Sequence, residues 1–142
     1  DAKHKDEVEV LSWSWGVSQT GNLAQGSGGG SGKANFSDVQ FTHHIDKASP
    51  LLMKACATGM HIKDATITAR KAGKGQQEYL IFKMNDILIT SVQPALSGGE
   101  SGVESVSLQA AKVDLEYKPQ KPDGSLDAGV HFKYDIKLNK VG

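Results

Sequence analysis

The chain has 142 residues, and its 16 basic and 16 acidic side chains give a formal net charge of zero. This length supports one independent core, so we expect a single domain over residues 1–142. The balanced charge disfavours a nucleic-acid binder, which needs a basic surplus, and it gives no electrostatic reason to sit on an anionic membrane.

Alternation of apolar and polar residues predicts that most elements are strands. The first strand covers residues 8–17, with Leu11, Trp13 and Trp15 on one face. Val10 falls on the other phase, which predicts a β-bulge near Val10 and Leu11. The same alternation predicts further strands over residues 35–45 and 64–71.

One short stretch between these strands has the pattern of a helix. Ser49 can cap it, and Pro50 suits the first helical position because its missing N–H is not needed there. Residues 51–57 are good helix formers, and Gly59 can take the left-handed conformation that ends a helix.

Residues 78–92 are almost continuously apolar, except at Asn85 and Asp86. This pattern predicts two strands that are covered on both faces and joined by a turn at those two residues. Residues 103–117 form the next strand, with a change of phase at Ala110 and Ala111.

A turn at Pro122, Asp123 and Gly124 precedes a last predicted strand over residues 130–138. Six or seven strands with one short helix indicate a mainly β fold, either an antiparallel barrel or a sandwich with a helical plug.

A glycine-rich segment, GSGGGSGK at residues 26–33, invites comparison with a phosphate-binding loop. The first glycine of that motif would fall at Ser27 and its hydroxyl residue at Ala34, and a strand pattern follows in place of a helix. Nucleotide binding is therefore disfavoured, and we expect residues 22–33 to form a flexible Gly/Ser-rich loop.

No pattern of catalytic, cofactor-binding or metal-ligating residues is present. The five histidines lack ligand spacing, and Cys56 alone can form neither a thiolate zinc site nor an internal disulfide. Cys56 is expected to fill a core position on the helix, and His43, on the apolar phase of its strand, to be a hydrogen-bonded core residue. No cofactor, no metal and no enzymatic activity are expected.

Folding in a reducing cytoplasm fits a chain without disulfides. No apolar run approaches the roughly 18 residues that a membrane-spanning helix needs. The first residues are hydrophilic, so no signal peptide is expected.

Several segments together resemble the Hcp (haemolysin-coregulated protein) family of type VI secretion proteins. They occur in the family's order over nearly the whole chain: residues 4–6 with 8–14, residues 45–50 before a helix that ends Ala55-Cys56, then Gly59 with His61 and Ile62, residues 79–94, and residues 113–119.

The resemblance implies a small antiparallel β-barrel of two sheets with one short α-helix on the side. The family's first strand would precede His4, so we expect the chain to lack it and to expose an unpaired edge. Residues 120–142 are expected to be a C-terminal extension that contains a strand.

The resemblance also implies a function: six copies close into a ring, and rings stack into the inner tube of the secretion system. The implied partners are further copies of the chain, the contractile sheath, the spike protein, and effector proteins in the lumen. Such a protein is structural, folds in the bacterial cytoplasm and is itself secreted. No nucleic acid and no membrane insertion are expected.

The Gly/Ser-rich loop is the sequence's candidate for the contact that stacks rings. Its candidate residues are Asn22, Gly26, Ser27, Gly28, Gly29, Gly30, Ser31 and Lys33. Two other functions remain open for a barrel of this size: binding of a small apolar ligand, and a tail-tube role like that of phage proteins.

Overall fold

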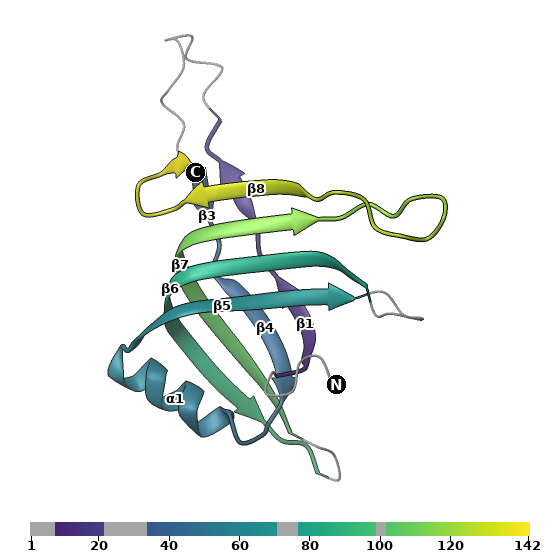
Figure 1. The fold of residues 1–142 in the computed structure, drawn as a ribbon. Coiled ribbons are helices and arrows are strands. Elements are labelled where there is room, and N and C mark those ends of the chain that lie inside the picture. The colour runs from purple at the N-terminus through teal and green to yellow at the C-terminus, as the bar shows by residue number, and fades with distance from the viewer. Residues whose placement is uncertain (1–7, 22–33, 71–76, 99–101) are drawn as a thin grey trace. The chain divides into compact units, whose positions relative to one another are not determined.

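The computed structural model describes residues 8–21, 34–70, 77–98 and 102–142. These residues belong to two compact units (Figure 1). Unit 1 contains Asp1–Met60 and Leu88–Gln109, and unit 2 contains His61–Ile87 and Ala110–Gly142. Two long strands, β6 (Glu78–Ala95) and β7 (Val103–Tyr117), are shared between the units, and one part of each strand lies in unit 1 and the other part in unit 2.

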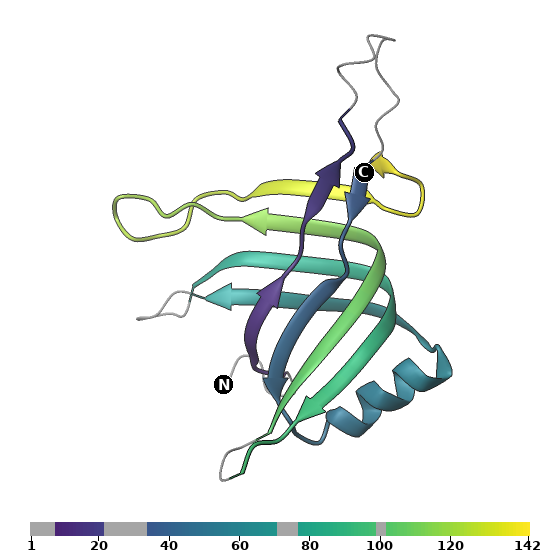
Figure 2. The same cartoon turned by 180° about the vertical axis from the view of Figure 1, so that it is seen from behind.

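Unit 1 contains the helix and the first strands of the chain. Its elements, beside the halves of β6 and β7, are β1 (Val10–Ser14), β2 (Val17–Gln19), β3 (Ala34–Phe36), β4 (Val39–His44) and α1 (Ser49–Thr58). β1 and β4 pair in antiparallel fashion, as do β4 and β7. β2 and β3 form a separate two-stranded ribbon that continues from β1 and β4 (Figure 2).

Unit 2 is a sheet whose strand order is β5, β6, β7, β8 and β9. Its remaining elements are β5 (His61–Arg70), β8 (Val130–Asp135) and β9 (Lys140–Val141). β7 and β8 are antiparallel, with Lys112 opposite Asp135 at one end of the ladder and Tyr117 opposite Val130 at the other.

Each unit has its own group of buried apolar side chains. Those of unit 1 are Val39, Ala55, Ile89, Val106 and Leu108. Those of unit 2 are Phe82, Met84, Ile87 and Val113. Burying a side chain of this size contributes about 1.5–3 kcal/mol, so these residues supply the main stabilisation of the two units.

The prediction of two strands over residues 78–92 is wrong, because β6 is one continuous strand. Asp86 adopts a positive φ of 55° within it. Met84 and Ile87 are both buried while Asn85 and Asp86 between them are exposed. The extra residue at this position acts as a β-bulge, which bends the strand and returns its apolar residues to the same face without a turn.

Two other predicted strands are interrupted. The strand over residues 8–17 is divided into β1 and β2 at Trp15 and Gly16, and the strand over 35–45 is divided at Ser37 and Asp38. The predicted bulge near Val10 is confirmed by a register shift in the pairing with β4.

The last predicted strand, residues 130–138, ends early at Asp135. The Leu138 N–H donates to the Asp135 carboxylate at 2.9 Å, which stabilises a turn before β9. β5 begins three residues before its predicted start, because Met60 closes the helix by donating to the Ala55 carbonyl and the strand follows at once.

The helix forms where the sequence predicts it, but Ser49 is not its cap. The cap position is Ala48, which makes no side-chain hydrogen bond, and the Ser49 hydroxyl instead accepts from the Asp46 N–H at 3.2 Å. Pro50 lies in the first turn, and Gly59 takes the predicted left-handed conformation at φ 66°.

The mainly β class, with antiparallel sheets and one helix in the described ranges, is confirmed. The expected closure into a barrel is not observed. The hydrogen-bonded order has β1 at one end and β5 at the other, and no ladder between them is found within the described part of the chain. Closure requires the two edge strands to pair in register, and here each keeps a free edge.

Candidate assembly surfaces

Each unit has strand edges whose backbone groups can pair with another chain. In unit 1, β1 has β4 as its only neighbour among the described strands. In unit 2, β5 pairs with β6 alone among the strands that the structure describes, and there the short β9 covers β8 at Tyr134 and Asp135. Open edges of this kind offer a row of N–H and C=O groups to an incoming strand.

Large apolar side chains are exposed in each unit. Unit 1 exposes Leu11, Val17, Leu51, Met53 and Leu96. In unit 2, Tyr117 and Val130 are directly opposite each other and are 48% and 65% exposed. Apolar side chains beside open edges are typical of surfaces that become buried in an assembly.

One face of the β7–β8 ladder is charged. The ring nitrogens Nδ1 and Nε2 of His131 lie 2.8 Å from the Asp114 carboxylate and 3.3 Å from that of Glu116. At the end of the ladder, Lys112 Nζ lies 3.9 Å from Asp135. Exposed ion pairs contribute at most about 1 kcal/mol each, so this ladder specifies strand register more than it adds stability.

The prediction that His43 is a hydrogen-bonded core residue is confirmed. His43 on β4 is opposite Glu104 on β7, both side chains are fully buried, and His43 Nε2 lies 2.8 Å from Glu104 Oε1. His43 Nδ1 and Glu104 Oε2 make no hydrogen bond. Asp46, at 3.9 Å from Nδ1, is the one further charged group beside the pair in the described part of unit 1.

A hydrogen bond between two side chains joins the bulge in β6 to the start of β5. His61 Nδ1 lies 2.8 Å from Asp86 Oδ1, and this hydrogen bond lowers the pKa of Asp86 below its ordinary value of 3.8. The charges of His61 and Lys137 act in the same direction. The bond with His61 holds Asp86 in its positive-φ conformation.

The described residues include no cluster of three or more His, Cys, Asp or Glu side chains that could hold a metal ion. Cys56 is half-buried on α1. The helix of the described chain is too short and too polar to cross a membrane.

The predicted stacking loop, residues 22–33, lies outside the described residues. The ribbon that leads into it is described: Trp15 stacks on Phe36 with ring centroids 5.7 Å apart, and the Ser37 N–H donates to the Gly16 carbonyl at 3.0 Å. All three residues of β2 are exposed. An isolated two-stranded ribbon is marginally stable in water, so contact with a partner would stabilise this one.

Comparison with known proteins identifies relatives over the whole chain. The family model described as "Type VI secretion system effector, Hcp" matches residues 1–117. Protein hcp1 of Pseudomonas aeruginosa is 46% identical over 142 residues, which cover 98% of this chain and 88% of that protein.

Solved structures agree with this match. The crystal structure of Hcp1 from Salmonella typhimurium superimposes with a TM-score of 0.81 at 36% identity, covering 100% of this chain and 89% of that one. A type VI secretion system effector from Yersinia pestis gives a TM-score of 0.78 at 35% identity, covering 96% of this chain and 89% of that one.

Proposed function

Because this chain belongs to the Hcp family of type VI secretion proteins, we propose that six copies of it close into a ring and that rings stack into the inner tube of the secretion machine. The chain is a secreted protein of that system and not an enzyme. The observation that carries the proposal is this family membership together with the open strand edges of both units.

A closed ring needs a head-to-tail interface in which two different surfaces of one copy match. The free edge of β1 and the free edges of β5 and β8 are such different surfaces. Pairing between edges of successive copies would satisfy the free backbone groups and cover the apolar side chains beside them, such as Leu11, Tyr117 and Val130.

The proposed partners follow from this assembly. Stacked rings enclose a lumen that carries and protects effector proteins, while the outside of the tube contacts the contractile sheath and its tip contacts the spike protein. The protein folds in the bacterial cytoplasm and leaves the cell with the tube. These partners are those that the family resemblance implies.

The Gly/Ser-rich loop is proposed as a stacking contact, and what supports this is that all three residues of β2, the strand before it, are exposed. Its proposed residues are Asn22, Gly26, Ser27, Gly28, Gly29, Gly30, Ser31 and Lys33. Deletion of residues 26–32 should leave rings intact and reduce the number and length of tubes in electron micrographs. Tubes of unchanged length would refute a role for the loop.

The ring itself is tested by size-exclusion chromatography with light scattering. A mass of six chains of 15.1 kDa is expected. A strict monomer at high concentration would contradict the proposal and would favour the alternative of a ligand-binding barrel.

A further inference from the structure

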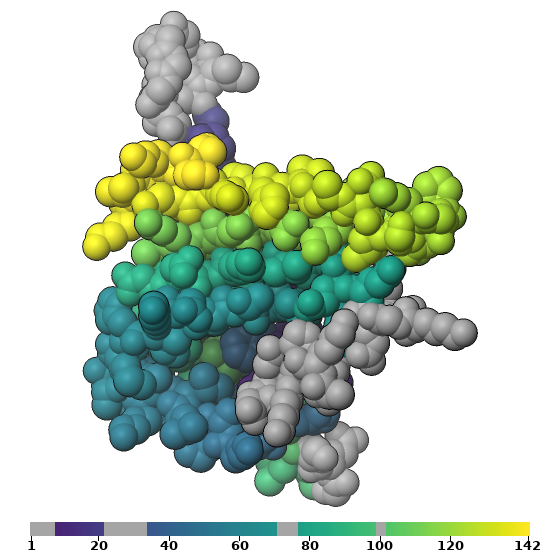
Figure 3. Space-filling view, viewed as in Figure 1, coloured from purple at the N-terminus to yellow at the C-terminus, as the bar shows by residue number. Residues whose placement is uncertain are grey.

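Unit 2 carries a projecting hairpin that is joined to β6 at its base, where the Lys118 N–H donates to the Tyr79 carbonyl at 2.8 Å. This arm, residues 118–129, connects β7 to β8 and extends past the described ends of β5 and β6 (Figure 3). The model of the family matches residues 1–117, so the arm lies outside the matched segment.

The arm is stiffened by its own hydrogen bonds. The Lys121 N–H donates to the Ser125 carbonyl at 2.7 Å, and the Gly124 N–H donates to the Lys121 carbonyl at 2.9 Å. Gly124 has a φ of 92°, which glycine adopts readily, and a bridge joins Gln120 to Leu126. An arm that is already ordered loses little conformational entropy when it binds.

The tip of the arm presents two exposed carboxylates, Asp123 and Asp127. Asp123 Oδ1 accepts hydrogen bonds from the Ser125 N–H at 2.9 Å and from its hydroxyl at 2.6 Å. These bonds lower the pKa of Asp123, so this carboxylate stays ionised. Lys121 is also exposed beside them.

The opposite end of unit 2 contains a lysine-rich hollow of about 730 Å³. It forms where the β6 bulge, the start of the unit 2 half of β7 and the turn after β8 meet. The residues that line it are Lys63, Asn85, Asp86, Ala111, Lys112, Asp135, Lys137 and Leu138.

The hollow is lined by three lysines and two carboxylates. Asp135 is already engaged by the Leu138 N–H and by Lys112. Lys63 and Lys137 form no ion pair with any residue that the structure describes. The hollow therefore offers the ammonium groups of Lys63 and Lys137, and the charge of Lys137 already helps to lower the pKa of Asp86.

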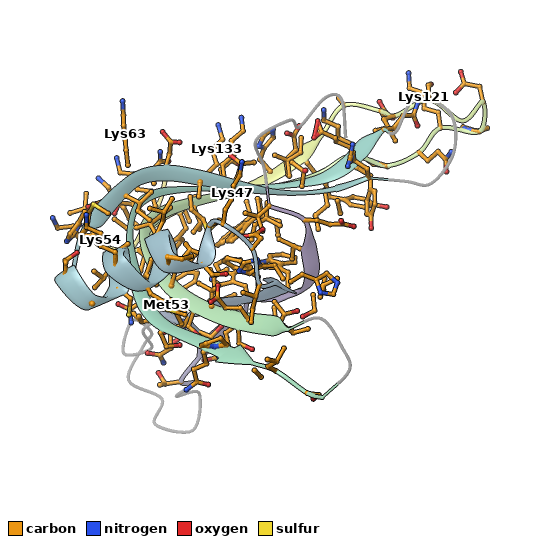
Figure 4. All side chains as sticks on the ribbon, turned by 90° about the horizontal axis from the view of Figure 1, so that it is seen from below. Lys47, Met53, Lys54, Lys63, Lys121 and Lys133 are labelled. Carbon is orange, nitrogen blue, oxygen red and sulfur yellow. The ribbon has the colours of Figure 1, made fainter. Side chains whose placement is uncertain are left out.

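An arm cannot reach the hollow of its own chain. Lys112, at the hollow, and Tyr117, at the base of the arm, are separated by about 17 Å along β7 at roughly 3.4 Å per residue. From Tyr117 the arm points away from the hollow: Figure 4 shows Lys63 at one end of unit 2 and Lys121 at the other. A contact between them has to join two copies.

From this geometry we propose that the acidic tip of the arm of one copy binds the lysine-lined hollow of a second copy. Asp123 and Asp127 would pair with Lys63 and Lys137, and Lys121 would lie near Asp86. An interface between opposite ends of the same unit is head-to-tail and repeats from copy to copy, so it can join one ring to the next in a stack. The inference rests on the proposed self-assembly and names one contact that stacks its rings.

The test reverses the charges of the arm alone, of the hollow alone, and then of both together. Asp123→Lys with Asp127→Lys, or Lys63→Asp with Lys137→Asp, should lower the stacking of rings by about tenfold, since interface pairs become repulsive. The combined variant should restore stacking. Stacks are counted by sedimentation and negative-stain electron microscopy, and ring mass is measured by light scattering.

Two further variants separate charge from folding. Asp123→Asn with Asp127→Asn keeps the acceptor oxygen for Ser125 and removes only the charge, and it should also weaken stacking. Lys54→Glu, an equally exposed reversal on α1 of unit 1, should leave stacking unchanged.

Each outcome decides between the two proposals. Wild-type chains that stay monomeric would overturn the ring itself. Rings that never stack would overturn only the arm contact, as would stacking that survives either one-sided reversal or is not restored by the combined variant. Loss on the arm side alone would show that the arm binds something other than this hollow, and it too overturns the inference.

Discussion

Replacing Glu104 by alanine should be among the most destabilising single changes in unit 1. Glu104 and His43 are both fully buried, and the 2.8 Å contact is the hydrogen bond that each side chain makes. His43 Nδ1 already lacks a partner, so the variant leaves the imidazole in the core without any hydrogen bond. Leaving a buried polar group without its hydrogen-bond partner costs about 1–3 kcal/mol.

The loss is measured by urea denaturation at fixed protein concentration, because assembly adds a concentration-dependent term to stability. A free energy of unfolding of about 5–15 kcal/mol makes such a loss a large fraction of the total. Combined replacement of His43 and Glu104 by leucine removes both polar groups and should cost much less than the single change.

The single variants Glu104→Leu and His43→Leu complete a double-mutant cycle with this double variant. A Glu104→Ala variant that loses under about 1 kcal/mol, a typical value for a single ordinary hydrogen bond, would refute the argument that the pair is buried and interdependent. So would a double variant that is as unstable as the sum of the two single changes.

Three further predictions concern single positions. Phe82→Ala empties a fully buried site in unit 2 and should cost about 3–5 kcal/mol by urea denaturation, whereas a cost below about 1 kcal/mol would place Phe82 outside the core. Gly59→Ala forces a methyl group into a left-handed conformation at φ 66° and should cost about 1 kcal/mol; an unchanged melting temperature would contradict this. The pKa of Asp86 is lowered from 3.8, so its stabilising bond with His61 is present above that pH and is lost as pH falls through the lower folded value. Asp86→Asn, which still tolerates positive φ, should remove the loss of stability that this bond causes at low pH, measured by thermal melts at several pH values. An unchanged pH profile would be evidence against a stabilising bond between His61 and Asp86.

The arm and the hollow show why assembly surfaces were hard to recognise in the sequence. The turn at Pro122, Asp123 and Gly124 was readable, because each residue suits a turn for a local reason. Lys63, Lys112 and Lys137 are far apart in the chain. They come to one end of unit 2 only because β5, β6, β7 and β8 lie side by side in one sheet.

The bulge at Asp86 illustrates the same difference for the fold. Asn85 and Asp86 are frequent in turns, so the sequence predicted a reversal of the chain there. The structure keeps one strand and places Asp86 at positive φ, because Met84 and Ile87 can then both enter the core. Burial of two large apolar side chains outweighs a local turn preference.

The sequence by itself determined the mainly β class, the short helix with Gly59 at its end, the strand over residues 103–117 and the core role of His43. These features follow from alternation along one strand or from the backbone preference of one residue, and both are local properties. The tertiary structure alone decided that His43 meets Glu104, that the strand order stays open, and that the arm with Asp123 and Asp127 and the lysine-lined hollow lie at the two ends of unit 2. Such features depend on the register between distant strands, where a shift of one residue would move every side chain to the other face.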